Sequence, residues 1–161
     1  MKVFGIAGWS GSGKTTLLTR LIPALTRLGV VVATVKHTHH NPALDLPESQ
    51  ALTEAGAEEV LLASSARFAL IEEIGGEAPE PALADLVGRF SGIDLLLVEG
   101  FKRSSHPKIE VWNPALGKPM LAPEDDRIVA IAADDPVPGL RLPHFTRNET
   151  DAIARFIIEF T

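Results

Sequence analysis

Residues 8–15, Gly-Trp-Ser-Gly-Ser-Gly-Lys-Thr, match the pattern Gly-x-x-x-x-Gly-Lys-Ser/Thr of a phosphate-binding loop (P-loop). Glycines let the backbone approach phosphate oxygens without a Cβ in the way, and the N–H groups of the following helix face the same anion. Lys14 can reach the β- and γ-phosphates of a nucleoside triphosphate, and the Thr15 hydroxyl suits Mg²⁺. The alternative is a chance glycine-rich turn, but the segment lies between a predicted strand and a predicted helix, as the motif requires. The predicted nucleotide-binding residues are Gly8, Ser10, Gly11, Ser12, Gly13, Lys14, Thr15 and Thr16, with Lys14 also catalytic.

The apolar run 95–98 has a carboxylate at each end, Asp94 before it and Glu99 after it. P-loop proteins use a carboxylate on a neighbouring strand to hold Mg²⁺ or the attacking water. The strand separates the two carboxylates by roughly 16 Å, at about 3.3 Å per residue. Ligands of parallel sheets bind beyond the carboxyl ends of the strands. We therefore assign Glu99 to catalysis and, with Thr15, to the metal site, and Asp94 to an ordinary structural role. Gly100 would let this loop approach the γ-phosphate.

Two basic segments follow predicted strands, residues 36–40 (Lys-His-Thr-His-His) and 102–108 (Lys-Arg-Ser-Ser-His-Pro-Lys). Both are expected at the carboxyl edge of the sheet, beside the phosphate loop. On a chain with a net charge of −6 this concentration of donors indicates an anion site. A histidine metal site and a solvated polar loop are the alternatives. The residues assigned to a second anionic ligand are Lys36, His37, His39, His40, Lys102 and Arg103.

The strand predicted at 128–132 runs towards Asp134. A carboxylate can accept hydrogen bonds from N1–H and N2–H₂ of guanine, which adenine cannot match. Asp134 is therefore a candidate for base recognition, although the usual Asn-Lys-x-Asp sequence is absent. A simple Asp-Asp-Pro turn explains the same residues equally well.

Apolar runs alternate with helical patterns along the chain. This alternation predicts an α/β protein with a three-layer P-loop NTPase fold and a mostly parallel sheet, in a single domain over 1–161. Pro23 interrupts the first helix and predicts a kink. The expected strands are 3–7, 30–35, 60–63, 68–71, 95–98, 109–112 and 128–132; the expected helices are 15–28, 48–57, 82–90 and a last one with Ile153, Phe156, Ile157 and Phe160 on its apolar face.

Composition limits the possible classes. The 161 residues are 45% hydrophobic and 22% charged, as in an ordinary globular protein. There is no cysteine, so disulfides and thiolate ligands are excluded. The acidic net charge argues against nucleic-acid or membrane-surface binding. The first apolar run is too short for a signal peptide, and none approaches the roughly 20 residues of a membrane span. We expect a cytoplasmic protein.

The chain resembles the molybdopterin-guanine dinucleotide biosynthesis adaptor family, MobB, over most of its length. Besides the phosphate loop, the resemblance is carried by residues 22–25 (Ile-Pro-Ala-Leu), 35–40 (Val-Lys-His-Thr-His-His), 54–57 (Glu-Ala-Gly-Ala) and 97–102 (Leu-Val-Glu-Gly-Phe-Lys). It implies a GTP-binding homodimer that hydrolyses GTP slowly with Mg²⁺. It further implies action beside the enzyme that joins GMP to molybdopterin, with the phosphate of the pterin suiting the basic segments.

One segment departs from the family pattern. After the histidines the family has a Pro-Gly-Lys-Asp-Ser stretch, whereas this chain has Asp-Leu-Pro-Glu-Ser at 45–49. Pro47 replaces the lysine, which weakens a phosphate-binding role for this loop. Glu48 keeps the acidic charge and is a candidate near Mg²⁺.

Two other functions compete with the adaptor. A P-loop kinase for a small molecule would need a lid with arginines, yet Arg67, Arg89 and Arg103 are scattered along the chain. A metal-delivery GTPase is compatible with the histidines but disfavoured by the absence of cysteine.

Overall fold

The computed structural model describes residues 1–38, 47–72, 74, 80–102, 104–137 and 139–160. The chain divides into two compact units, residues 1–38 with 83–161, and residues 39–82. This division by contacts does not decide the single-domain assignment, which stays a prediction. None of the helices in the described ranges has the length and hydrophobicity to cross a membrane.

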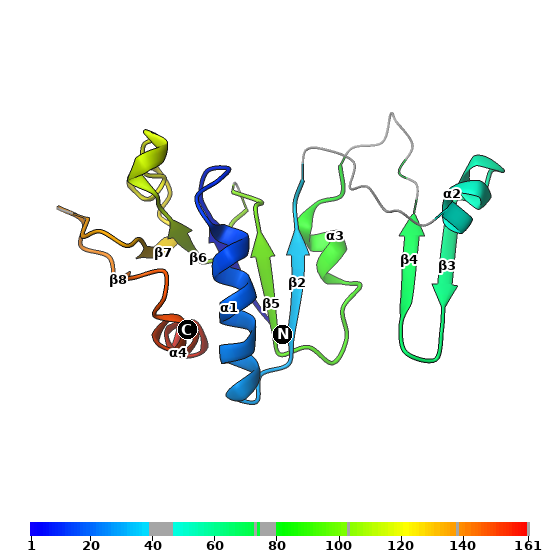
Figure 1. The fold of residues 1–161 in the computed structure, drawn as a ribbon, viewed down its shortest axis with the longest axis horizontal. Helices are drawn as coiled ribbons and strands as arrows, with labels where there is room; N and C mark the ends of the chain where they lie inside the picture. Colours follow the sequence, from blue (N-terminus) through cyan, green and yellow to red (C-terminus); the bar gives the residue numbers. More distant parts are fainter. Residues whose placement is uncertain (39–46, 73, 75–79, 103, 138, 161) are drawn as a thin grey trace. The chain divides into compact units, whose positions relative to one another are not determined.

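The larger unit is built on a six-stranded sheet with every strand parallel to its neighbours. Figure 1 shows the strands side by side, with the phosphate loop leaving the sheet at their carboxyl ends. β5 is buried along its whole length, which explains its uninterrupted apolar sequence. The strands in sheet order are β2 (Val32–Lys36), β5 (Leu95–Glu99), β1 (Lys2–Ala7), β6 (Lys108–Val111), β7 (Ile128–Ala132) and β8 (His144–Phe145).

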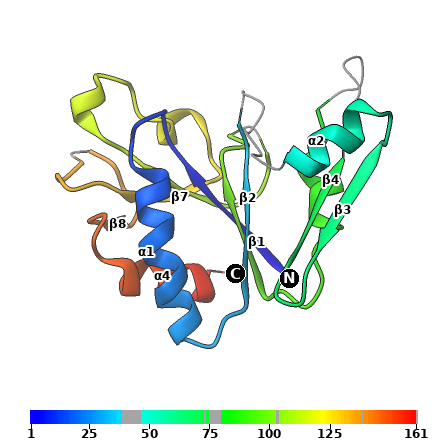
Figure 2. The same ribbon diagram turned by 45° about the vertical axis from the view of Figure 1, so that its right-hand side comes forward.

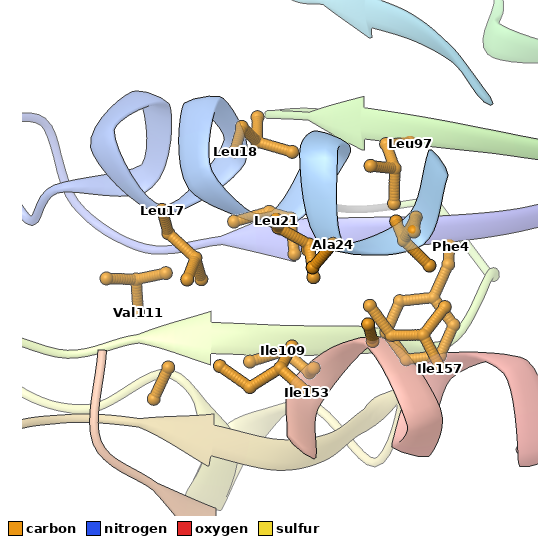
Figure 3. Close-up of a cluster of buried hydrophobic side chains, with 14 of the residues drawn as sticks. Phe4, Leu17, Leu18, Leu21, Ala24, Leu97, Ile109, Val111, Ile153 and Ile157 are labelled. Carbon is orange, nitrogen blue, oxygen red and sulfur yellow. The ribbon is translucent and has the colours of Figure 1, made fainter. Parts of the chain in front are cut away.

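Two helices cover one face of this sheet, α1 (Lys14–Arg27) and α4 (Thr150–Glu159). They lie against each other in both ribbon views (Figures 1 and 2), although α1 ends at Arg27 and α4 begins only at Thr150. Figure 3 shows Leu21 of α1 and Ile157 of α4 in the same cluster of apolar side chains, and both side chains are fully buried. A shorter helix, α3 (Leu83–Val87), precedes β5.

The opposite face of β7 is covered by side chains from the segments on either side of this strand, which are Trp112, Met120, Leu121, Ala122, Val137, Leu140 and Leu142. Ile131 is buried there among partly exposed side chains that include Trp112 and Met120. Two 3₁₀ helices, Pro114–Leu116 and Ala122–Glu124, shape this layer. Its backbone is tied to the sheet through Glu110 of β6, whose two carboxylate oxygens each accept an N–H bond at 2.8 Å. Together with the helical layer this confirms the predicted three-layer α/β architecture.

The smaller unit contains α2 (Pro47–Glu54) and an antiparallel hairpin of β3 (Glu59–Ala63) and β4 (Phe68–Glu72). Figure 2 shows this hairpin beside its helix. The hairpin forms a separate two-stranded sheet. The sequence predicted a mostly parallel sheet, and the antiparallel strand pair of the described residues belongs to this hairpin.

The predicted elements exist, but their limits differ. β2 begins later than expected and includes Lys36, while α2 and α3 are shorter than predicted. β8 was missed because two residues are too short for any periodic pattern. Pro23 lies within a continuous α1, and the kink stays a prediction.

Candidate functional site

The phosphate loop joins the carboxyl end of β1 to the start of α1. Gly13 is the N-cap of α1 with a φ of 100°, and it has no side chain to cap the helix. Amide groups in the first turn of a helix have no carbonyl partner within it, so this end suits an anion. Gly8 has a φ of 141°, and a Cβ there would lie 2.4 Å from the carbonyl oxygen of Val111. This contact explains why only glycine fits where the loop passes over β6.

Glu99 and Thr15 meet at the carboxyl edge, as the sequence predicted. The Thr15 hydroxyl donates to the Glu99 carboxylate, with Oγ1 at 2.8 Å from Oε1 and 3.0 Å from Oε2. Parallel pairing of β5 with β1 and β2 places Glu99 opposite Ile6 and Lys36. The Lys36 ammonium lies 3.6 Å from Glu99 Oε1 and 3.4 Å from Thr15 Oγ1.

Lys14 bends back over the loop, where its ammonium donates to the carbonyl oxygen of Trp9 at 2.9 Å. Burial lowers the pKa of Lys14; the Glu99 carboxylate opposes this shift, and the charges of Lys102 and Lys36 add to it. The Lys14 ammonium therefore lies within the influence of one carboxylate and two further ammonium groups. This local excess of positive charge on an acidic protein is the property that an anion site needs.

Gly100 and His37 fix how the chain leaves β5 and β2. Gly100 has a φ of 97°, and a Cβ on it would lie 2.8 Å from Cβ of His37. Phe101 follows with a positive φ of 45°, and its ring centroid is 4.8 Å from that of His37. The two exit loops are thus packed together beside Glu99.

Trp9 forms a second part of the site that the sequence did not indicate. Its indole N–H donates to the carbonyl oxygen of Pro119 at 2.7 Å, which fixes the ring. Lys102 places its ammonium 4.4 Å from the ring centroid, and Lys118 lies at 5.7 Å. Lys102, predicted from the basic segment, therefore stands next to the phosphate loop, and it is joined by a lysine from the covering layer.

Asp134 lies beyond the carboxyl end of β7, and its carboxylate forms an ion pair with Arg147. The same arginine donates to the carbonyl oxygen of Ser12 in the phosphate loop at 3.3 Å. The hydrogen bond from the Arg147 side chain holds the pKa of Asp134 below its ordinary value. Because 135 positions separate Arg147 from Ser12, no local sequence signal could have revealed the arginine.

Other predicted residues lie apart or cannot be placed. Thr16 is exposed in the first turn of α1, beside the loop. Asp94 accepts an N–H bond from Val31 at 2.8 Å at the start of β5, which agrees with its structural assignment. His39, His40, Arg103 and the side chain of Glu48 lie outside the described residues.

The basic segment 102–108 does not face the loop as a whole, contrary to expectation. Lys108 begins β6, is 1% exposed and forms an ion pair with Asp125 at 2.9 Å. His106 packs against Gly5, with its Nε2 only 2.5 Å from the position of an ideal Cβ. The chain turns back from the carboxyl edge to begin a parallel strand, so Lys102 stays beside the loop whereas His106 and Lys108 do not.

The fold and the site are those of a P-loop NTPase. The sheet is parallel, a glycine loop precedes α1, and a hydroxyl-carboxylate pair lies at the end of the adjacent strand. Comparison with known families agrees. The model of the family described as MobB, molybdopterin guanine dinucleotide synthesis protein B, matches residues 3–134. The chain belongs to the MobB family.

Named relatives and solved structures cover nearly the same length. The molybdopterin-guanine dinucleotide biosynthesis adapter protein of Escherichia coli (strain K12) is 38% identical, over 98% of this chain and 92% of its own. The adapter protein of the same name from Haemophilus influenzae is 40% identical, over 84% of this chain and 76% of its own. A crystal structure of molybdopterin-guanine biosynthesis protein B (mobB) superposes with a TM-score of 0.76 at 31% identity, covering 99% of each chain.

Proposed function

We propose that the chain is a GTP-binding adaptor with slow, Mg²⁺-dependent GTPase activity in the biosynthesis of molybdopterin guanine dinucleotide. The contact between Thr15 and Glu99, within reach of the Lys36 ammonium, carries the nucleotide part of this proposal. The names of the MobB relatives, biosynthesis adapter proteins, support the adaptor part.

In this proposal the phosphate loop and the first turn of α1 bind the β- and γ-phosphates. The Lys14 ammonium exchanges the Trp9 carbonyl for phosphate oxygens, a stronger, charge-assisted partner. Gly100 keeps the exit of β5 close to the γ-phosphate, where Glu99 orients the attacking water or binds the metal. Positioning and charge stabilisation are the main contributions a protein makes to phosphoryl transfer.

The residues present fit Mg²⁺. Hard oxygen donors are the ligands it prefers, and Thr15 and Glu99 supply a hydroxyl and a carboxylate. Thr15 Oγ1 lies 2.8 Å and 3.0 Å from the two carboxylate oxygens of Glu99, so these donors are adjacent and could hold one ion together. When bound, the ion would neutralise charge on the β- and γ-phosphates.

A second anionic ligand is proposed on the same edge. Lys36 and Lys102 contribute charge there, and His37 lies beside Gly100. We assign the phosphate of a molybdopterin-type ligand to this area, with His39, His40 and Arg103 as further candidates from the sequence. The ring of Trp9 offers an aromatic surface next to these cations.

The adaptor would work with the enzyme that joins GMP to molybdopterin, and it would do so as a homodimer in the cytoplasm. These parts rest on the family and on composition. Among the described residues the cations near Glu99 are Lys14 and Lys36. Slow turnover is consistent with these lysines, since arginines that stabilise transition-state charge accelerate such reactions by about 10³–10⁵.

Titration calorimetry of GTP, with and without Mg²⁺, tests the nucleotide site. Lys14→Ala should weaken GTP binding at least about tenfold because a charge-assisted contact is lost. Glu99→Gln should remove most of the gain in affinity that Mg²⁺ confers. Glu124→Gln, an exposed carboxylate of the covering layer, is the matched control and should behave as wild type. Unchanged affinity in Lys14→Ala would contradict the assignment.

Turnover with and without acceptors separates the adaptor from the kinase. We expect slow phosphate release from GTP that candidate small-molecule acceptors do not accelerate. Rapid transfer of phosphate to an acceptor would instead identify a P-loop kinase. Micromolar binding of a transition metal, lost in His37→Ala and in His39→Ala, would favour metal delivery.

A further inference from the structure

Arg147 connects three segments that converge at the carboxyl edge. Its guanidinium binds the Asp134 carboxylate after β7 through Nη2 and the Ser12 carbonyl in the phosphate loop through Nη1. Its backbone N–H also donates to Asp134 Oδ1 at 3.3 Å. The parallel pairing of β8 with β7 brings these residues together, since Ala132 is opposite Phe145.

The contact with the loop is close. A Cβ on Gly13 would lie 3.2 Å from Arg147 Nη1, so the guanidinium lies over the residue that caps α1. The arginine and aspartate side chains are 31% and 48% exposed. The Arg27–Asp151 pair, which joins the other end of α1 to α4, is 64% and 74% exposed and has no link to the loop. The Arg147 pair is therefore less exposed than the Arg27 pair, and its arginine also contacts the loop.

The order of the strands indicates on which side of the phosphate loop the γ-phosphate and the nucleoside would lie. Glu99 ends β5, on one side of β1, and Asp134 and Arg147 follow β7 and β8, on the other side. If Glu99 and Thr15 mark the metal and the γ-phosphate, the nucleoside leaves the loop on the side of β7 and β8. The aspartate-arginine pair then stands at the nucleoside end.

A carboxylate can distinguish bases only when it is held in place. An aspartate accepts from both N1–H and N2–H₂ of guanine, but a freely rotating side chain does so weakly. The planar fork of arginine can hold a carboxylate and a carbonyl at once, which the single ammonium of lysine does less well. Each carboxylate oxygen keeps a second lone pair for the base.

We infer that Arg147 is a specificity-determining positioning residue, which holds the Asp134 carboxylate in register with the phosphate loop so that guanine is selected. The inference rests on the proposed GTP site and adds the residue that links base recognition to phosphate binding.

The test compares Mg²⁺ complexes of GTP, ITP and inorganic tripolyphosphate by titration calorimetry. ITP lacks only the N2 amino group of GTP, and tripolyphosphate has no base. Wild type should prefer GTP to ITP by about tenfold, the effect of one hydrogen bond to a charged group. Arg147→Met should abolish most of this preference and change tripolyphosphate affinity less than about twofold.

Three further variants sharpen the result. Arg147→Lys should restore the preference only in part. Asp134→Asn should lose it as fully as Arg147→Met, and the double variant should lose no more, because the arginine acts through the aspartate. Arg27→Met removes the exposed arginine-aspartate pair between α1 and α4 and should leave the preference unchanged. Thermal unfolding of each variant checks that the fold is retained.

Two results would overturn the inference while leaving the proposed function standing. In the first, Arg147→Met keeps the full preference for GTP over ITP. In the second, it weakens all three ligands equally, which would make Arg147 a support of the loop alone. Failure of wild type to bind any of the three ligands would instead refute the proposed nucleotide site itself.

Discussion

At the end of β5, two adjacent residues meet different demands. Glu99 supplies a carboxylate, and the strand direction alone separates it from Asp94, which bonds the backbone of Val31 at the other end. Gly100 supplies a backbone conformation, because its φ of 97° and its contact with His37 both exclude a side chain. The need for a carboxylate at position 99 can be inferred from the sequence, whereas the need for glycine at position 100 depends on the contact with the neighbouring loop.

Replacing Gly100 with alanine tests this constraint. We expect Gly100→Ala to lower the free energy of unfolding by about 3 kcal/mol, since a positive φ and a close contact both act against the new Cβ. Gly29→Ala is the matched control. Gly29 has a φ of 81° with nothing within 4 Å of an added Cβ, so only the backbone cost of about 1 kcal/mol applies. Urea denaturation measures both, and equal losses would contradict the packing argument.

The start of β6 and the turn before it place residues of one basic segment in different surroundings. Lys102 stays beside the phosphate loop, whereas His106 and Lys108 lie against the sheet. The ring nitrogens of His106 have no hydrogen-bond partner within the described part of the chain. Burial lowers the pKa of His106 to about 4; the positive charge of Lys108 adds to this shift, and Asp125 opposes it.

This shift predicts a pH-dependent stability. The unfolded chain protonates His106 near pH 6.5, but the folded chain does so only near pH 4. The unfolded state therefore binds the extra proton in between, and stability falls as pH decreases from about 6.5 towards 4. The half-buried position is partly screened by solvent, so we expect a loss of about 1 kcal/mol.

Urea denaturation at pH 7 and pH 5 measures the effect in wild type and His106→Gln, which cannot take up this proton. The variant should lose less stability than wild type between the two pH values. A parallel decline in both proteins would show that other groups cause the acid sensitivity.

In the larger unit, an early helix of the sequence, α1, packs against the last helix, α4. Their apolar faces form one core over the sheet (Figure 3). Polar contacts continue along the surface, where Arg20 donates to Asn148 at 2.6 Å and Arg27 pairs with Asp151. The helix that carries the phosphate loop is therefore held by the helix that follows Arg147.

Two adjacent isoleucines of α4 test this coupling. Ile157 is fully buried, and Ile158 is 40% exposed. Ile157→Ala should lower the free energy of unfolding by about 3 kcal/mol because it leaves a cavity beneath α1. Ile158→Ala should cost less than about 1 kcal/mol. Chemical denaturation gives both values, and a loss below about 1 kcal/mol for Ile157→Ala would contradict the packing of α4 into the core.

The sequence by itself determined the local features. Patterns within a few residues indicate the phosphate loop, the apolar strands, the apolar faces of α1 and α4, and the place of Glu99 at the carboxyl end of its strand. Such patterns reflect backbone conformation and burial, which are properties of a short segment. Such patterns do not define where an element begins or ends, and they cannot detect a strand as short as the two-residue β8.

Only the tertiary structure decided which distant groups share the site. Arg147 reaches Ser12, Lys118 lies near Trp9, and Lys108 turns away, although it belongs to the same basic segment as Lys102. Strand order and strand direction set these placements, and both depend on the packing of the whole sheet and not on neighbours in the chain. The phosphate loop was thus evident from its own residues, whereas its surroundings depend on contacts that only folding creates.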